Sequence, residues 1–158
     1  MQIFLYYVDF VFYMLVLKGF DPEDVGTMIK LVRETFGKDY SRDLFFEMGT
    51  LFPEEFMTVF DDSNLVGFLM GALTSPKEAR VLIFAIDRQH RGKGVGSQVM
   101  SSFIDHCRKK GVERIRLEVK TTNENAIKLY RKFGFKAVDV LEKYYRDGND
   151  GYLMYLEL

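Results

Sequence analysis

The stretch QHRGKGVGS, residues 89–97, is the most informative part of the sequence because it joins an apolar strand to an amphipathic helix through closely spaced glycines. The strand before it covers residues 81–87, and Val99, Met100 and Phe103 lie on one face of the helix after it. Glycines let the backbone turn tightly and leave no side chain over the first-turn amides, whose unpaired N–H groups and dipole favour an anion. The stretch therefore predicts a pyrophosphate-binding loop.

Two known glycine motifs do not describe this loop. The nucleotide P-loop needs G-x-x-x-x-G-K-[ST], the dinucleotide fingerprint needs G-x-G-x-x-G, and neither pattern occurs in this stretch. What remains is Q-x-x-G-x-G, formed by Gln89, Gly92 and Gly94. Basic side chains at positions 88–93 surround these glycines, and such local positive charge suits a small polyanion better than a duplex.

Composition limits the class of protein. A chain of 158 residues, 47% hydrophobic and 28% charged, has the size of one globular domain with a full core. Its formal net charge of −1 gives no sign of nucleic-acid binding, which usually shows as a basic stripe. Cys107 is the only cysteine, which excludes an intrachain disulfide and favours a reducing, cytoplasmic compartment. His90 and His106 have no ligand companions at helical spacing, so no metal site is predicted.

The first 17 residues, MQIFLYYVDFVFYMLVL, are apolar and aromatic. They lack the basic region and cleavage site of a signal peptide, carry Asp9 at their centre, and fall short of the ~20 residues that a membrane-spanning helix needs. We therefore predict no membrane association. Their composition favours a strand that packs on a sheet edge or on a second subunit, which would make a homodimer. Residues 1–13 are predicted to be an extension and residues 14–158 a single domain, with Met14 as a second candidate start.

The remaining chain alternates strands and helices. We expect strands at residues 14–18, 56–60, 65–73, 80–87, 114–120, 135–141 and 152–158, and helices at 22–36, 41–52, 95–110 and 124–133. Gly37 is placed to end the first helix, and Thr121 stands at capping-box spacing from Glu124 at the start of the last. The order β-α-α-β-β-β-α-β-α-β-β predicts a mixed sheet with helices on its faces.

Three separated segments carry a family resemblance: FAIDRQHRGKGVGSQVM (84–100), RLEVKTTNENAIKLYRKFGF (116–135) and EKYYRDGNDGYLMYLEL (142–158). They resemble the GNAT superfamily of acetyl-CoA-dependent N-acetyltransferases over roughly residues 14–158. The L-E-V, N-x-x-A-x-x-L-Y and Tyr-Tyr elements are similar to the ribosomal-protein-alanine (RimI-type) and related protein N-terminal acetyltransferases. The resemblance implies an α/β (α+β) fold whose mixed, mostly antiparallel central sheet has helices on both faces.

The resemblance also implies the roles of individual residues, with acetyl-CoA as co-substrate and no metal. Glu118 would be the general base and Tyr130 the general acid. The pantetheine arm would pair with the backbone of Phe84, Ala85 and Ile86, as an added strand pairs with a free edge. The other implied cofactor contacts are Arg91, Gly92, Lys93, Gly94, Val95, Gly96, Ser97 and Asn123, and the substrate contacts are Tyr144 and Tyr145. The chain departs from the family at Arg88 and His90, where proline and tyrosine are frequent.

Each of these residues also has a simpler structural interpretation. Glu118 could pair with Arg116 on the polar face of its strand, Tyr130 could be a core aromatic, and the two tyrosines could anchor a hairpin. For the chemistry, an amine must lose a proton, the carbonyl oxygen must be stabilised and a thiolate must leave. No cysteine or serine nucleophile is implied, so direct transfer in a ternary complex is predicted.

The acceptor is expected to be an N-terminal amine. An α-amino group titrates near ~7.7 to 8.0 and a lysine near ~10.4, so deprotonating lysine at neutral pH costs about 3 kcal/mol more. The acceptor site is expected from residues 41–52 and the hairpin around Tyr144 and Tyr145. Two alternatives stay open: acetylation of a small amine or a lysine side chain, and a non-catalytic acyl-CoA-binding module.

Overall fold

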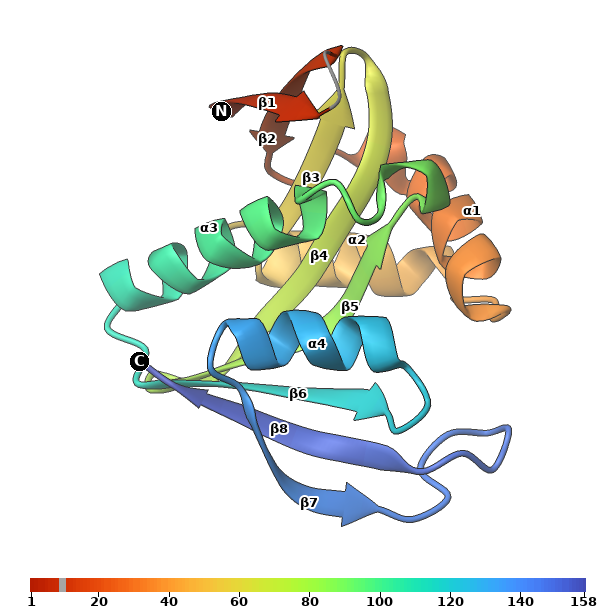
Figure 1. Ribbon diagram of the computed structural model, residues 1–158, viewed down its shortest axis with the longest axis vertical. Helices are drawn as coiled ribbons and strands as arrows, with labels where there is room; N and C mark the ends of the chain where they lie inside the picture. Colours follow the sequence, from red (N-terminus) through yellow and green to blue (C-terminus); the bar gives the residue numbers. More distant parts are fainter. Residues whose placement is uncertain (9–10) are drawn as a thin grey trace.

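The computed structural model describes residues 1–8 and 11–158, and the side chains of all of these outside residues 4–14. Over these residues it forms one eight-stranded sheet in the order β1-β2-β3-β4-β5-β6-β8-β7 (Figure 1). The strands are β1 (Gln2–Val8), β2 (Val11–Lys18), β3 (Phe56–Asp61), β4 (Asn64–Ser75), β5 (Glu78–Ile86), β6 (Arg114–Lys120), β7 (Lys136–Leu141) and β8 (Gly151–Glu157). The helices are α1 (Val25–Phe36), α2 (Arg42–Leu51), α3 (Val95–Lys109) and α4 (Glu124–Lys132), with short 3₁₀ turns η1 (Pro22–Asp24) and η2 (Arg88–His90).

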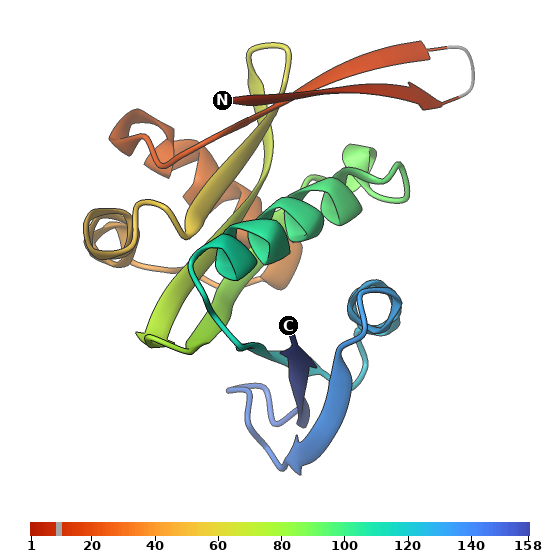
Figure 2. The same cartoon turned by 90° about the vertical axis from the view of Figure 1, so that its left-hand side faces the viewer.

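Helices cover both faces of this sheet, as predicted. Figure 1 shows α3 and α4 in front of the strands with α1 and α2 behind them, and Figure 2 shows the same layers from the side. One core cluster joins Phe103 of α3 to Ile115 and Leu117 of β6, and a second joins Phe45 of α2 to Phe68 of β4. The sheet is therefore the middle layer of three, and residues that alternate along a strand face different cores.

The strands β5 and β6 form the sheet's parallel pair and separate part-way along it. Their pairing runs from Glu78↔Arg114 to Val81↔Leu117. Beyond this point β5 pairs with β4 alone, and β6 pairs with β8 alone. Figure 1 shows the two strands diverging. The edge of β5 after Val81 consequently presents backbone groups that no neighbouring strand occupies on that side.

A β-bulge lies where the two strands part. Gly71 pairs with Val81 and Met70 with Ile83, so Leu82 has no partner in the β4 register, and the β6 register has already ended. The bulge changes which core the following side chains enter: Val81 belongs to the α3 cluster, whereas Ile83 belongs to the α1 cluster. Bulges are frequent beside active sites because they re-aim side chains and end strand pairing.

The N-terminal segment is paired within the sheet. β1 runs antiparallel to β2 from Gln2↔Leu17 to Val8↔Val11, which matches the sheet-edge alternative. The predicted boundary between residues 13 and 14 falls inside β2, so it stays a prediction about domain organisation. Asp9, which argued against a membrane span, lies outside the described residues. Within the part of the chain described, no helix is long and apolar enough to cross a bilayer.

The start of α4 corrects one sequence-based expectation. Its N-cap is Asn123, whose side-chain oxygen accepts a hydrogen bond from the Ala126 amide at 3.3 Å. The predicted cap, Thr121, lies before the helix in a turn, and its amide donates to the Asp150 carbonyl at 3.1 Å. Both residue types favour N-caps, so the capping-box spacing was a weak discriminator. Asn123 therefore caps α4, in addition to its predicted contact with the cofactor.

Candidate active site

The glycine loop delivers the chain to the N-terminus of α3 beside the free edge of β5. Gly94 is the N-cap, has a φ of 82° and provides no side-chain cap. That backbone conformation is costly for residues with a Cβ, which explains the glycine. A Cβ added at Gly96 would lie 3.4 Å from Leu129 of α4 and 3.7 Å from Phe84 of β5. The first turn of α3 thus packs closely against both neighbours, with its positive dipole end at the loop.

Of the side chains around the loop, some are buried in the core and others hold the loop in place through hydrogen bonds and ion pairs. Val95 is buried, so only its backbone is available to a ligand. The Arg91 guanidinium donates to the Ile86 carbonyl at 2.8 Å and to the Thr35 hydroxyl of α1 at 3.1 Å. His90 lies between two carboxylates, with Nδ1 2.8 Å from Asp87 and Nε2 3.1 Å from Asp61. These contacts hold the loop against α1 and the β3–β4 hairpin, so the structure uses the Arg91 side chain to brace the loop.

Two residues near this end were missed from sequence. Lys132 of α4 donates to the Ser97 hydroxyl at 3.4 Å and so places a cation beside the first turn of α3. Leu82, the bulge residue, stands at the start of the free β5 edge and is 37% exposed. Neither position has a local sequence signal, because each depends on which strand or helix lies opposite. Further along this edge, Phe84 and Ile86 pack on the α3 core while Ala85 is buried on the other face.

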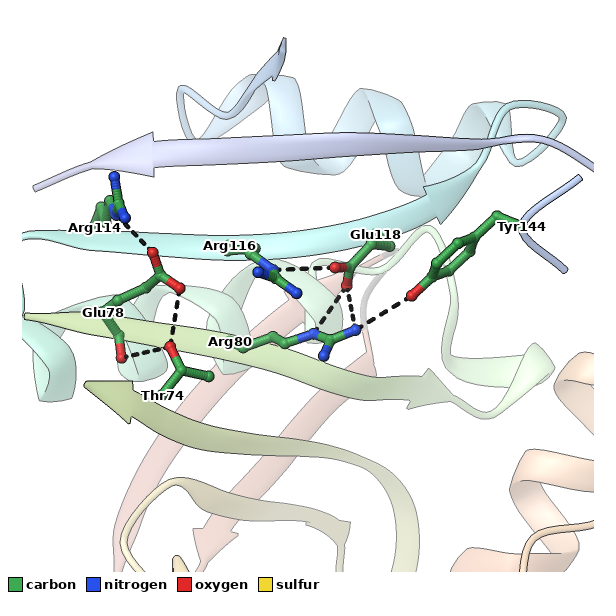
Figure 3. Close-up of polar contacts among 7 residues, drawn as sticks. All are labelled: Thr74, Glu78, Arg80, Arg114, Arg116, Glu118 and Tyr144. Atoms are coloured by element: carbon green, nitrogen blue, oxygen red, sulfur yellow. Dashed lines mark hydrogen bonds and ion pairs between the residues drawn. The ribbon is translucent and has the colours of Figure 1, made fainter. Parts of the chain in front are cut away.

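Glu118 projects from the polar face of β6 into a cluster of charged side chains (Figure 3). Its side chain is only 7% exposed. Oε2 lies 3.1 Å from Nε and 3.0 Å from Nη2 of Arg80, and Oε1 lies 3.1 Å from Nε of Arg116. The pairing with Arg116 follows from sequence spacing, but Arg80 comes from β5 and was not predicted. Two guanidiniums therefore contact this one carboxylate and compensate its charge.

The loop between β7 and β8 carries the two predicted substrate tyrosines to this cluster. Tyr144 accepts a hydrogen bond from Arg80 at 3.3 Å and is 45% exposed. Tyr145 packs edge-on against it, with ring centroids 5.1 Å apart. Lys38, in the loop between α1 and α2, lies over the Tyr145 ring at 4.9 Å. The structure therefore joins the β7–β8 loop to the residues just before the predicted helix at 41–52, whose Phe45 is buried in the core.

Tyr130 of α4 is a buried phenol, as its apolar helix face predicted. Burial raises its pKa above the ordinary tyrosine range, and Tyr145 adds to the effect. Burial likewise raises the pKa of Tyr145, with further contributions from Tyr144 and Glu118. Tyr145 is thus within electrostatic reach of both Tyr130 and Glu118. The site thus combines a phenol that burial keeps protonated with a carboxylate held by two arginines, the two kinds of group that acid–base catalysis uses.

Cys107 and a cluster of two glutamates and a histidine bear on the nucleophile and the metal site that the sequence did not predict. Burial raises the pKa of the Cys107 thiol to about 12, so this side chain is a poor nucleophile at neutral pH. The tertiary structure brings Glu54, Glu55 and His106 together, with one ligand atom from each within 4.8 Å of the others. Lys110 ion-pairs with both glutamates and so already neutralises part of their charge. A hollow of about 490 Å³ beside His106 contains none of the predicted site residues.

Comparison with known proteins identifies the family. The model of the acetyltransferase (GNAT) family matches residues 25–135, which include the glycine loop, Glu118 and Tyr130. The chain belongs to the GNAT family of acetyltransferases. As a GNAT enzyme it uses acetyl-CoA as its co-substrate, which confirms the predictions of family, fold class and reaction.

Relatives and solved structures agree with this assignment. The GNAT domain is 32% identical to an N-alpha-acetyltransferase of Sulfurisphaera tokodaii, over 83% of this chain and 86% of the relative. It is 26% identical to a putative ribosomal-protein-bS18-alanine N-acetyltransferase of Bacillus subtilis, over 86% and 91%. The crystal structure of Ard1 from Thermoplasma volcanium matches with a TM-score of 0.88 and 33% identity, covering 91% of this chain and 97% of Ard1. Arabidopsis thaliana Naa50 in complex with the bisubstrate analogue CoA-Ac-MVNAL matches with a TM-score of 0.82 and 25% identity, covering 91% and 99%.

Proposed function

We propose that this enzyme acetylates the N-terminal α-amine of a protein or peptide by direct attack on acetyl-CoA in a ternary complex. The observation that carries the proposal is the position of Glu118. Its carboxylate is held by arginine beside the point where β5 and β6 part, next to Tyr144 and Tyr145 on a loop. Relatives named N-alpha-acetyltransferase support the same acceptor class.

The free edge and the glycine loop supply the cofactor end of the site. The pantetheine arm pairs with the backbone of residues 84–86, as an added strand extends a sheet. Its pyrophosphate lies at the first turn of α3, from Gly92 to Ser97, with Lys132 beside Ser97 as a further cation. Asn123 contacts the cofactor from the start of α4. The thioester then lies near the bulge at Leu82.

The transfer requires two proton movements. The amine nitrogen attacks the thioester carbonyl carbon and gives up a proton, through water, to Glu118. The C–S bond breaks, and the departing thiolate takes the phenolic proton of Tyr130, whose burial keeps it protonated. No acyl-enzyme forms, which agrees with the buried, un-ionised state of Cys107. An α-amine needs less help from a base than a lysine does, because it loses its proton more readily.

The cellular location, the partners and the oligomeric state are the less specific parts of the proposal. The single cysteine supports a cytoplasmic location, and a net charge of −1 supports a protein acceptor over nucleic acid. We also propose that residues 14–158 are the acetyltransferase domain, extended by residues 1–13, and that the enzyme is a homodimer through this apolar segment. β1 supports this because it is the terminal strand of the sheet and residues 1–8 contain no charged side chain.

The decisive experiment combines cofactor binding with acceptor choice. Thermal unfolding is measured with and without acetyl-CoA, and acetyl transfer is followed by mass spectrometry on matched peptides with free or blocked N-termini, each containing one lysine. A ligand at 100 times its dissociation constant adds about 2.7 kcal/mol of stability, so the midpoint should rise clearly. We expect transfer to free N-termini alone. Transfer that persists on blocked peptides would refute the acceptor assignment, and a raised midpoint without transfer to any amine would favour a binding module.

A further inference from the structure

The carboxylate of Glu118 is held by two arginines that differ in what else they contact. Arg80 and Arg116 are direct partners across β5 and β6, one position before the two strands separate. Arg116 contacts Oε1 and is the cross-strand partner of Tyr155 in β8. Arg80 takes Oε2 and reaches outward to Tyr144. One arginine therefore ties Glu118 to the sheet, and the other ties it to the β7–β8 loop.

Arg80 makes these contacts through one end of its guanidinium. Nε and Nη2 both face Oε2 of Glu118, at 3.1 and 3.0 Å, and Nη2 also donates to the Tyr144 hydroxyl at 3.3 Å (Figure 3). Nη2 carries two hydrogens in a fixed plane, so one can point at the carboxylate while the other points at the phenol. A displacement of Tyr144 therefore changes the orientation of the group that holds the carboxylate.

We propose that Arg80 is a positioning residue that couples the β7–β8 loop to the base, so that the placement of Tyr144 sets the orientation of Glu118. The inference rests on the proposed function, in which that loop contacts the acceptor and Glu118 takes the proton. Acceptor binding against Tyr144 then orients the carboxylate through a single shared nitrogen. Arg80 is partly buried, with 28% of its side chain exposed, which limits competition from water.

The test begins with Arg80→Met and Arg80→Lys in the full chain, with kcat and KM measured separately for a free-N-terminus peptide. Arg80→Met should lower kcat/KM roughly 10- to 100-fold, since a charge-assisted hydrogen bond at the base is lost. The loss should fall on kcat and leave KM for the peptide little changed, because Arg80 contacts Glu118 and Tyr144 and acts through them. Arg80→Lys should recover little of the rate, because lysine lacks the planar fork. The rise in melting midpoint with acetyl-CoA should stay unchanged in both.

Arg114→Met is the matched control for the loss of an arginine from the same sheet face. Arg114 pairs with Glu78 at 2.6 Å across the same two strands, and Thr74 donates to that glutamate (Figure 3). This pair lies at the other end of the β5–β6 ladder, away from the point of divergence. Removing it should leave both kcat and KM unchanged. If Arg114→Met reproduces the loss of kcat seen in Arg80→Met, Arg80 has a general structural role and the proposal is wrong.

A double-mutant cycle tests the coupling itself. Tyr144→Phe should lower kcat/KM in the wild-type background and have little further effect in Arg80→Met, because the link is already broken. In Arg116→Met the effect of Tyr144→Phe should remain in full. If the losses of kcat/KM from Arg80→Met and Tyr144→Phe are additive, the coupling is refuted, even where Arg80→Met alone lowers the rate. Should Arg80→Met fail to fold, the Arg80→Lys cycle decides in the same way. Wild-type failure to acetylate free N-termini would instead refute the proposed function.

Discussion

At the scale of single residues, the proposed acid, Tyr130, and the proposed base, Glu118, have different surroundings. Tyr130 is buried in the α3–α4 core, which keeps its phenol protonated. Glu118 is also poorly exposed, yet two guanidiniums compensate the cost of burying its charge. Environment of this kind lets two ordinary side chains take opposite roles at one pH.

Tyr130→Phe removes only the phenolic hydroxyl, so it tests the general acid directly. We expect kcat to fall about 100-fold, because the departing thiolate loses its proton donor. The wild-type rate should not decline through loss of this proton until the pH exceeds the ordinary tyrosine range near ~10, since burial raises the pKa. Steady-state kinetics across pH and the melting midpoint provide the measurements. A variant with unchanged kcat would remove Tyr130 from the mechanism.

At the scale of elements, the link between β5, η2 and α3 forms the proposed cofactor end, and its glycines are constrained by conformation. Gly92 has a φ of 71° and no atom within 4 Å of the position that a Cβ would take, and Gly111, at the other end of α3, has a φ of 74° and similar space. A side chain is therefore unfavourable at both positions for the same reason, the positive φ of the backbone. They differ in what lies beside them, because only Gly92 belongs to the predicted pyrophosphate loop.

Gly92→Ala and Gly111→Ala form a matched pair for this loop. Each should lower the free energy of unfolding by roughly 1 to 2 kcal/mol, the cost of a left-handed conformation for a residue with a Cβ. Only Gly92→Ala should also weaken acetyl-CoA binding, measured by calorimetry against the wild type. Equal affinities in the two variants would show that the backbone conformation at Gly92 does not matter for the cofactor.

At the scale of the whole molecule, the sheet extends beyond the part that holds the site. The core uses Leu15, Val16 and Leu17 of β2, which pair with β3, whereas β1 pairs only with β2. The candidate active site lies further along the sheet, at β5, β6 and β8. An N-terminal hairpin of this kind can change assembly without touching the chemistry.

Deletion of residues 1–13 tests both the domain boundary and the dimer. The truncated chain keeps the residues of β2 that pair with β3, so we expect it to fold and to bind acetyl-CoA as the full chain does. Its mass by light scattering should fall from dimer to monomer. An unchanged mass would refute the proposed interface, and loss of folding would show that the domain begins before Met14.

The parts predictable from sequence are those with a local physical cause. The alternation of Ile115, Leu117 and Val119 along β6 follows from strand geometry, and Ser41 and Gly37 act at the helix ends where their residue types predict. The predicted cap at Thr121 was wrong because Asn123, with the same propensity, lies nearer the helix. β1 was harder to place, since its composition suits a sheet edge and a subunit interface equally.

The order of elements, the glycine loop ahead of α3 and the family were all predictable from the sequence, because each depends on patterns within short contiguous segments. Tertiary structure alone decided where β5 and β6 part, which residue bulges there, and that Arg80 and Tyr144 meet at Glu118. Arg80 and Glu118 are distant in sequence, and their contact depends on strand register, which is set by the whole packed sheet. Local patterns hold no information on that register, so Glu118 could be proposed as the base from the chain, whereas its contacts with Arg80 and Tyr144 could not be predicted.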